Sequence, residues 1–287
     1  MIEINAGSKA LSLILFSIAA FVLATLVWEV SVCDARLGSS EQCSDTEAAW
    51  FVTLSKPSVV LEQFRAMDEA MKGELWERSK ATFVVSLMSI FYICIITLAM
   101  IVAGTWMLYK FGWNLFAWFY SVLWMLQVIP ILSYVSILGA LAGQWGIPSI
   151  DNVVLGVIIG LFPMVSEILL GMANIPKSHQ ELLRVFNANI WQVIKITVFP
   201  QITKSFFSGL YVAAPLAIVG VVLADIAGGN FLGLGATINA NVTSLDKKHV
   251  VWIATFGIVA ISLSILLLVA ILEWLFARKF AWYGDTD

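Results

Sequence analysis

The sequence is poor in charge, and this shortage excludes whole classes of protein. Only 12% of the 287 residues are charged, whereas 60% are hydrophobic. Soluble globular domains carry about twice that share of charge, so the composition indicates a polytopic membrane protein. The net charge is −3, and no basic run or RNA-binding motif is present. We therefore expect no nucleic-acid partner.

Cysteine and histidine are too scarce for a disulfide framework or a histidine-based metal site. The chain has three cysteines and two histidines, and His179 and His249 lie far apart in sequence. Cys94 lies inside an apolar segment, where a free thiol packs as a small hydrophobic group. Cys33 and Cys43 flank a short polar loop, and they would form a disulfide only if that loop faces an oxidising compartment.

Motifs for nucleotide binding and for hydrolysis are also missing. The sequence has no G-x-x-x-x-G-K-[ST] phosphate loop, no H-E-x-x-H zinc motif, no Cys-x-x-Cys pair and no G-x-S-x-G elbow. A membrane enzyme would bury a cluster of polar residues in its spans, but the apolar segments here are nearly free of them. We therefore expect no enzyme activity, no metal and no cofactor in this chain.

Long hydrophobic segments dominate what is present. Six of them are long enough to cross a bilayer, which needs roughly 20 residues in a helix. Backbone groups in lipid have no other partners, so each span must be helical, and the fold class is all-α. The third contains Pro130, which predicts a break there. The predicted spans are residues 10–29, 81–109, 114–142, 152–174, 205–224 and 250–275.

The chain divides at about residue 80. Residues 1–80 comprise the first span and a long loop, and we expect an uncleaved anchor helix because no A-x-A cleavage site follows it. Within that loop, residues 58–79 place apolar side chains at helical spacing, which predicts an amphipathic helix on the membrane or on the bundle. Residues 81–287 hold the other five spans.

One polar segment interrupts the hydrophobic region between the fourth and fifth spans. Residues 176–200 read PKSHQELLRVFNANIWQVIKITVFP, a pattern that predicts two short helices. Ser178 with Glu181 forms an S-x-x-E capping box, and Asn189 with Gln192 forms a second, weaker one. From periodicity alone, a docking element and an ordinary interfacial loop are equally good interpretations.

The charge distribution favours a cytoplasmic location for this segment. Lysine and arginine are equally divided between the two predicted sides, so their totals do not decide the topology. Most charges on the predicted outer side lie in one long loop, where acids outnumber bases, and Arg278 and Lys279 directly follow the last span. Short flanking segments carry the positive-inside signal, so we expect the N-terminus and residues 176–204 in the cytoplasm.

Glu167 is the carboxylate placed deepest in a predicted span, within FPMVSEILLG. Intramembrane carboxylates are costly and often functional. A pathway or proton-coupling group is the functional interpretation, and a carboxylate hydrogen-bonded between helices is the structural one, which we favour. In the same span, Gly156 and Gly160 form G-x-x-x-G, which permits close helix approach. The glycine cluster at 228–235 predicts a re-entrant loop on the outer side.

The segment from Glu181 to Pro200 resembles the cytoplasmic loop of binding-protein-dependent ABC importer permeases. The family pattern is Glu-Ala-Ala, three residues, Gly, nine residues, Ile, one residue, Leu-Pro. Glu181 and Pro200 have the right separation, and Ala188, Trp191 and Gln192 resemble the usual sequel. The departures from the pattern are Leu182, Leu183, Asn187, Thr197 and Phe199.

Other stretches between residues 55 and 283 resemble the branch of this family for nitrate, sulfonate, taurine and riboflavin precursors. They are KPSVVLEQF, IPILSYVSILGALAGQWG, FPMVSEILLGM and FLGLGATI, and their order and spacing carry more weight than any one match. An arginine that is common early in the second span of the family is missing, and Val85 stands in its place. The substrate within this branch is left open.

The resemblance implies a transmembrane subunit of a type I ABC importer, multi-pass in the inner membrane. Two such subunits, with an identical second chain expected, would form the pathway among membrane lipids. Separate ATPase subunits would bind ATP and Mg²⁺ and dock on residues 178–200, while an extracytoplasmic binding protein would deliver substrate. The alternatives are an ion-coupled secondary transporter using Glu167 and a non-transporting membrane scaffold. The expected ATPase-coupling residues are Ser178, Glu181, Arg184, Asn187, Ala188, Trp191 and Pro200.

Overall fold

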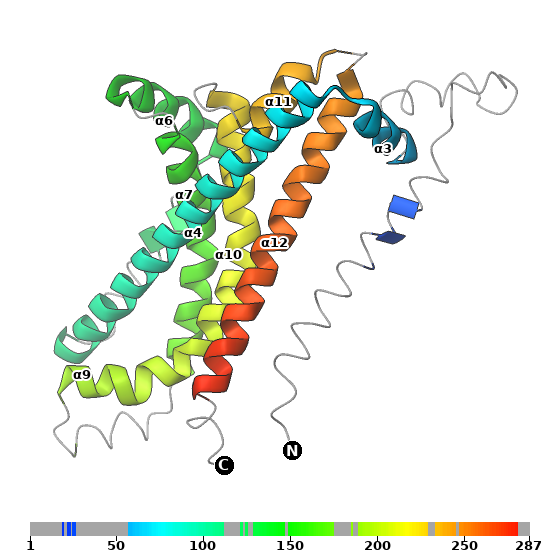
Figure 1. Ribbon diagram of the computed structural model, residues 1–287. Coiled ribbons are helices and arrows are strands. Elements are labelled where there is room, and N and C mark those ends of the chain that lie inside the picture. Colours follow the sequence, from blue (N-terminus) through cyan, green and yellow to red (C-terminus); the bar gives the residue numbers. More distant parts are fainter. Residues whose placement is uncertain are drawn as a thin grey trace, which may run out of the picture. The chain divides into compact units, whose positions relative to one another are not determined.

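All regular structure in the described part of the protein is helical in a computed structural model (Figure 1). This agrees with the predicted all-α class. The expected anchor helix at 10–29 lies largely outside the described residues, as does the polar loop at 31–50. The structure describes residues 19, 22–23, 25–26, 57–111, 121–122, 124–125, 129–146, 149–174, 185, 189–228, 233–244 and 247–280.

Four described helical stretches are long and apolar enough to cross a membrane: Glu69–Met107, Ile150–Ala173, Trp191–Ala227 and Lys248–Arg278. They correspond to the predicted second, fourth, fifth and sixth spans. The helices in chain order are α3 (Pro57–Ala66), α4 (Glu69–Phe111), α6 (Ile131–Trp145), α7 (Ile150–Ala173), α9 (Ile190–Val193), the π-helical turn η2 (Ile194–Val198), α10 (Phe199–Gly228), α11 (Leu234–Asn241) and α12 (Lys248–Phe280).

The break predicted at Pro130 is confirmed. Pro130 is extended, with φ −55° and ψ 128°, and α6 begins directly after it at Ile131. A proline cannot donate the backbone hydrogen bond that a continuous helix needs at this point, but its fixed φ suits a helix start. At the other end, Gly146 closes α6 with a positive φ of 64°, which glycine adopts without steric cost.

The prediction of one amphipathic helix over residues 58–79 is wrong. The structure divides it, because α3 ends at Ala66 and a new helix, α4, begins at Glu69 and runs on into the second span. Asp68 accounts for the restart: its carbonyl accepts a hydrogen bond from the Lys72 backbone N–H at 3.0 Å, and aspartate is favoured at a helix N-cap. Glu69 then lies in the first turn, where a carboxylate complements the helix dipole.

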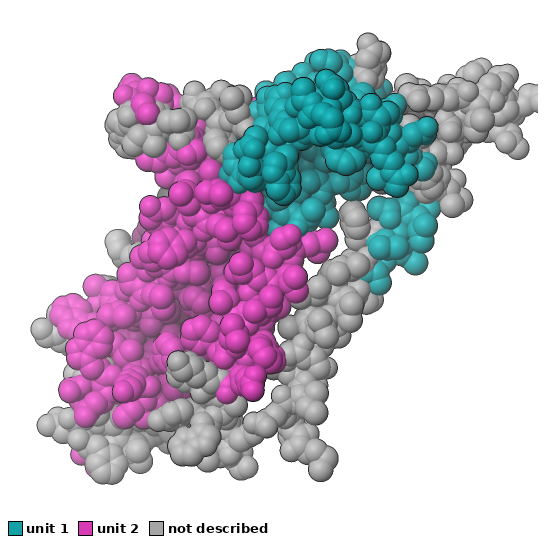
Figure 2. Space-filling view, viewed as in Figure 1, with its two compact units in different colours: residues 1–81, 232–261 teal, residues 82–231, 262–287 magenta. Residues whose placement is uncertain are grey.

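The chain divides into two compact units, one of residues 1–81 with 232–261 and one of residues 82–231 with 262–287 (Figure 2). In the first unit, the Arg78 guanidinium donates to the Thr237 hydroxyl at 3.1 Å, which ties the start of α4 to α11. Arg78 also pairs with Glu74 one turn earlier on its own helix. Thus α11, which follows the glycine cluster, is anchored within its own unit.

The centre of the second unit is the antiparallel pair of α7 and α10, which lie side by side (Figure 1). Glycines allow their backbones to meet. A Cβ added at Gly220 would lie 2.8 Å from the Gly156 Cα, and one added at Gly160 would lie 3.0 Å from the Ala213 carbonyl oxygen. The close approach predicted from the G-x-x-x-G pair is confirmed, with α10 as the partner helix.

Within the second unit, α4 turns small polar side chains inward and large apolar ones outward. The Ser89 hydroxyl donates to the Val85 carbonyl at 3.0 Å and also lies 3.3 Å from the Val153 carbonyl of α7. Its buried polar residues are Thr82, Ser86, Ser89, Thr97 and Thr105. Its exposed apolar stripe, spaced by three or four residues, is Val84, Met88, Phe91, Ile95, Leu98, Val102 and Trp106.

Candidate functional site

The second of the two predicted capping boxes is confirmed at the start of α9. The Asn189 side-chain oxygen accepts from the Gln192 backbone N–H at 3.0 Å, and the Gln192 side-chain oxygen accepts from the Asn189 backbone N–H at 2.8 Å. Two donors that a helix start leaves unpaired are thereby satisfied reciprocally. The other expected coupling residues, Ser178, Glu181, Arg184, Asn187 and Ala188, lie outside the described part of the chain.

Pro200 lies just inside α10, and the π-helical turn η2 precedes it. The Phe199 backbone N–H donates to the Ile194 carbonyl, five residues earlier, so the turn is one residue wider than in an α-helix. Pro200 has no N–H to offer, and its ring would crowd the carbonyl four residues before it. The widened turn therefore allows α9 to continue into α10, and Trp191–Ala227 forms one span.

One side of the segment 189–200 packs into the second unit. Val198 is buried in a cluster with Ile202 of α10, Ile101 of α4 and Ile168 and Met172 of α7, and Val193 packs against this cluster. The opposite side is open: Trp191 is 67% exposed, and Lys195 and Ile196 are also exposed. The segment is thus held by three helices while it presents an aromatic and a basic side chain outward.

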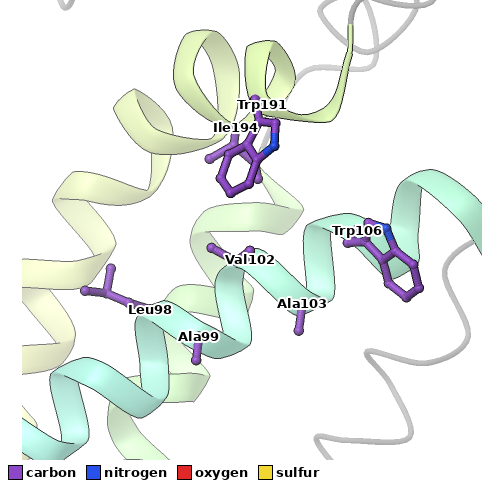
Figure 3. Close-up of a pocket in the computed structure, with 7 residues that line it drawn as sticks. All are labelled: Leu98, Ala99, Val102, Ala103, Trp106, Trp191 and Ile194. Carbon is purple, nitrogen blue, oxygen red and sulfur yellow. The ribbon is translucent and has the colours of Figure 1, made fainter.

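An apolar groove of about 680 Å³ lies between this segment and α4 (Figure 3). Trp191 and Ile194 form one wall. On α4, Ala99 and Ala103 are small enough to leave the space open. The sequence interpretation included Trp191 but missed the α4 wall, because apolar residues about 90 positions away give no signal of contact. The remaining lining residues are Leu98, Val102 and Trp106.

Glu167 is half-buried on α7, on the side of the helix near α10. A Cβ added at Gly209 of α10 would lie 3.1 Å from the Glu167 Cβ, so the missing side chain at Gly209 makes room there. No described residue forms an ion pair or a hydrogen bond with the Glu167 carboxylate. Among the described residues, then, the interhelical hydrogen bond of the structural interpretation is not present.

A buried polar cluster at the opposite end of α7 was missed by the sequence interpretation. Asp151 and Asn152 are 1% and 0% exposed, and the Asn152 amide donates to the Val221 carbonyl of α10 at 2.9 Å. Asp225, one turn after Val221, is 2% exposed. Oδ2 of Asp151 and Oδ1 of Asn152 have no hydrogen-bond partner among the described atoms. The only signal in the sequence was a polar pair following Pro148 at a helix start.

Two further side chains have defined surroundings in the second unit. The Tyr211 hydroxyl of α10 donates to the Glu273 carboxylate of α12 at 2.7 Å, so Glu273 is held by protein as well as lying near a span end. Cys94 is a free, half-buried cysteine on α4, as predicted. Cys33 and Cys43 lie outside the described residues, and their disulfide stays a prediction.

Residues 95–280 match the family model of the binding-protein-dependent transport system inner membrane component. The chain belongs to this family. It is therefore a permease component of an ABC transporter, a multi-pass inner-membrane protein, as the resemblance of the segment Glu181–Pro200 indicated. The permease is 26% identical over 152 residues to the riboflavin transport system permease protein RibX of Chloroflexus aurantiacus. That match covers 53% of this chain and 55% of the relative, so the chain spans about half the length of the curated relative it matches.

Proposed function

We propose that this permease is the membrane subunit of an ATP-driven importer and that residues 178–200 dock on a separate ATPase subunit. The observation that carries the proposal is the two-sided segment 189–200. Its packed side is fixed to α4, α7 and α10 by Val193 and Val198, and its open side presents Trp191 and Lys195. An element that is rigidly held on one side and free on the other suits a partner that pushes on it.

The coupling would proceed through rigid bodies. ATP and Mg²⁺ bind in the partner ATPase, whose closure displaces α9. Because η2 continues α9 into α10 without a break, the displacement carries α10 with it. The glycine contacts then carry α7 along with α10, since tightly packed helices move as units rather than deform. A second copy of the permease would complete the pathway, and an extracytoplasmic binding protein would supply the substrate.

The proposed substrate class rests on the resemblance to one branch of the family. The sequence segments resemble permeases for nitrate, sulfonates, taurine and riboflavin precursors, and the matched relative is a riboflavin transport permease. A small polar nutrient delivered from outside the cell is the substrate that these similarities favour.

Copurification tests the docking proposal. A tagged permease expressed with its neighbouring transport subunits should retain an ATPase subunit, and Glu181→Lys should release it by reversing the charge at the start of the segment. Glu62→Lys is the matched control, because Glu62 is an exposed glutamate of α3, in the other unit. ATPase retained equally by wild type and Glu181→Lys, with transport intact, would refute docking through this segment.

A further inference from the structure

We propose that the groove between α4 and the segment 189–200 binds an acyl chain of an anionic membrane phospholipid, a site that goes beyond the transport function proposed above. The groove holds about 680 Å³, within the range of about 300–1,000 Å³ that ligand sites occupy. Its lining residues carry no charge, and the indole N–H groups of the two tryptophans are their only polar side-chain groups. Such walls offer almost nothing to water or to a small polar solute, whereas a hydrocarbon chain suits them.

The α4 wall of the groove continues the exposed apolar stripe of that helix. Leu98, Val102 and Trp106 line the groove and are also the last three members of the stripe, which begins at Val84. All of these residues lie within the membrane-spanning stretch Glu69–Met107. A row of large apolar side chains on the outside of a span suits lipid, so lipid chains reach the groove along the same stripe.

The length of the groove matches one leaflet of a bilayer. From Leu98 to Trp106 the helix rises roughly 12 Å, at about 1.5 Å per residue. The hydrocarbon layer of one leaflet is about 15 Å thick, half of the bilayer core. The groove lies at the end of the span where the segment 189–200 packs, which is the predicted cytoplasmic side. A chain of the cytoplasmic leaflet therefore fits along the groove, and this depth favours lipid over a side chain of the proposed ATPase.

The cytoplasmic end of the groove has the aromatic and basic side chains that favour lipid headgroups. Trp106 lies near the end of the span, and the Trp191 ring points from α9 toward α4 (Figure 3). Tryptophan is enriched at this depth because one part of its ring is apolar and another donates a hydrogen bond. Lys195 is exposed four residues after Trp191, which places both on one face of the helix. Its ammonium group complements the negative headgroups of the cytoplasmic leaflet.

Photoreactive lipids test the site. The full-length permease is reconstituted in phosphatidylcholine vesicles that contain a trace of phospholipid with a diazirine on one acyl chain, near the headgroup. The headgroup of this probe is either phosphatidylglycerol, which is anionic, or phosphatidylcholine, which is zwitterionic. Ala103→Phe and Ala99→Phe each fill the groove, because both alanines line it. Ala277→Phe is the matched control, an exposed alanine of α12 that does not line the groove.

We expect the probe to label residues 190–196, with the phosphatidylglycerol form at least threefold more efficient than the phosphatidylcholine form. Either groove-filling variant should reduce this labelling at least fivefold, whereas Ala277→Phe should leave it unchanged. Labelling of residues 84–95, outside the groove, should be the same in all variants, which shows that they are folded. Lys195→Gln should remove the headgroup preference and keep the labelling. No labelling of residues 190–196 in the wild-type permease, labelling unchanged in both filled variants, or equal labelling by the two probes would overturn the proposal.

A photoreactive phenylalanine analogue in place of Trp106 identifies the occupant in cells that express the complete transporter. We expect an adduct that adds the mass of one phospholipid to the permease. An adduct of the size of two permease chains, or of permease plus ATPase, would overturn lipid binding and assign the groove to a protein contact. The ATPase adduct would at the same time support the docking function, so the two proposals fail separately.

Discussion

The exposed faces of α4 and α7 differ in extent, although both helices contribute to the second unit. On α4 the exposed side chains along residues 84–106 are apolar or aromatic, and the small polar side chains such as Ser89 point inward. On α7 the glycines and Glu167 lie on the side packed against α10, and the exposed residues Leu170, Ala173 and Asn174 are confined to the C-terminal end. A long exposed face of this kind suits contact with lipid, and we infer that α4 presents it to the membrane.

A buried charge on the lipid-facing helix should have the largest effect. Leu98→Asp places a carboxylate on the apolar stripe of α4, and we expect a loss of about 2.5 kcal/mol in insertion or stability. Leu170→Asp on α7 should cost less than about 1 kcal/mol, because Leu170 lies in the last turn of the helix, where a carboxylate can reach the membrane surface. For each variant, the yield of purified protein measures insertion, and the melting temperature in detergent measures stability. Equal losses at the two positions would contradict the assignment of faces.

Adding a side chain where α7 and α10 meet at Gly220 should cause the next largest loss of stability. Gly220→Ala puts a methyl group against the backbone of Gly156, and overpacking of this kind costs about 2 kcal/mol. Gly143→Ala in α6 is the control, since a Cβ there meets nothing within 4 Å. The control should stabilise its helix slightly, because alanine is a better helix former than glycine. Thermal unfolding followed by loss of the monodisperse peak in gel filtration would separate the two variants.

Removing the cap at the start of α9 should have an intermediate, local effect. Asn189→Ala leaves the Gln192 backbone N–H without its acceptor, at a cost of about 1 kcal/mol. Hydrogen exchange should accelerate in residues 190–195 and remain unchanged in α7. Asn189→Ser, which keeps a capping oxygen, should restore most of the protection; exchange that is equally fast in both variants would show that the cap does not hold this helix.

The inward polar face of α4 should show the smallest effect. Ser89→Ala removes one hydroxyl between α4 and α7, and such contacts in membrane proteins contribute about 0.6 kcal/mol each. We expect a shift in melting temperature of only a few degrees, and less than that from Gly220→Ala. A larger loss from Ser89→Ala than from Gly220→Ala would mean that the hydrogen bond between α4 and α7 contributes more than the backbone contact between α7 and α10.

The elements that could be predicted from sequence are those set by local chemistry. The length of the apolar segments predicted the described spans, and Pro130 predicted the break before α6. Asn189 and Gln192 predicted the start of α9. Each of these features depends on residues that are close together in the chain. The start of α4 at Glu69 was missed, because residues 58–79 were assigned to one amphipathic helix separate from the span that begins at 81. In the structure the polar stretch from Glu69 continues into the span, with ion pairs between Glu74 and Arg78 and between Glu77 and Lys80. Ion pairs at this spacing support an exposed helix by about 0.3–0.5 kcal/mol each.

Features that depend on distant segments could not be predicted. The groove is lined by both Trp191 and Ala99, two apolar residues about 90 positions apart that only the tertiary fold brings to one site. The burial of Asp151 depends on tertiary packing at the start of α7, which no local pattern reveals. The interpretation of Glu167 also depends on its neighbours, because Gly209 opposite it provides space and no hydrogen bond.

A photocrosslink at Trp191 tests the coupling role most directly. Trp191 is 67% exposed and Phe91 of α4 is 61% exposed, so the two positions match in residue class and accessibility. With a photoreactive phenylalanine analogue at either site in cells expressing the full transporter, we expect an adduct of the size of permease plus ATPase from position 191 and none from position 91. An ATPase adduct from position 91, or no adduct from position 191 in a transporter that still imports substrate, would contradict docking through α9.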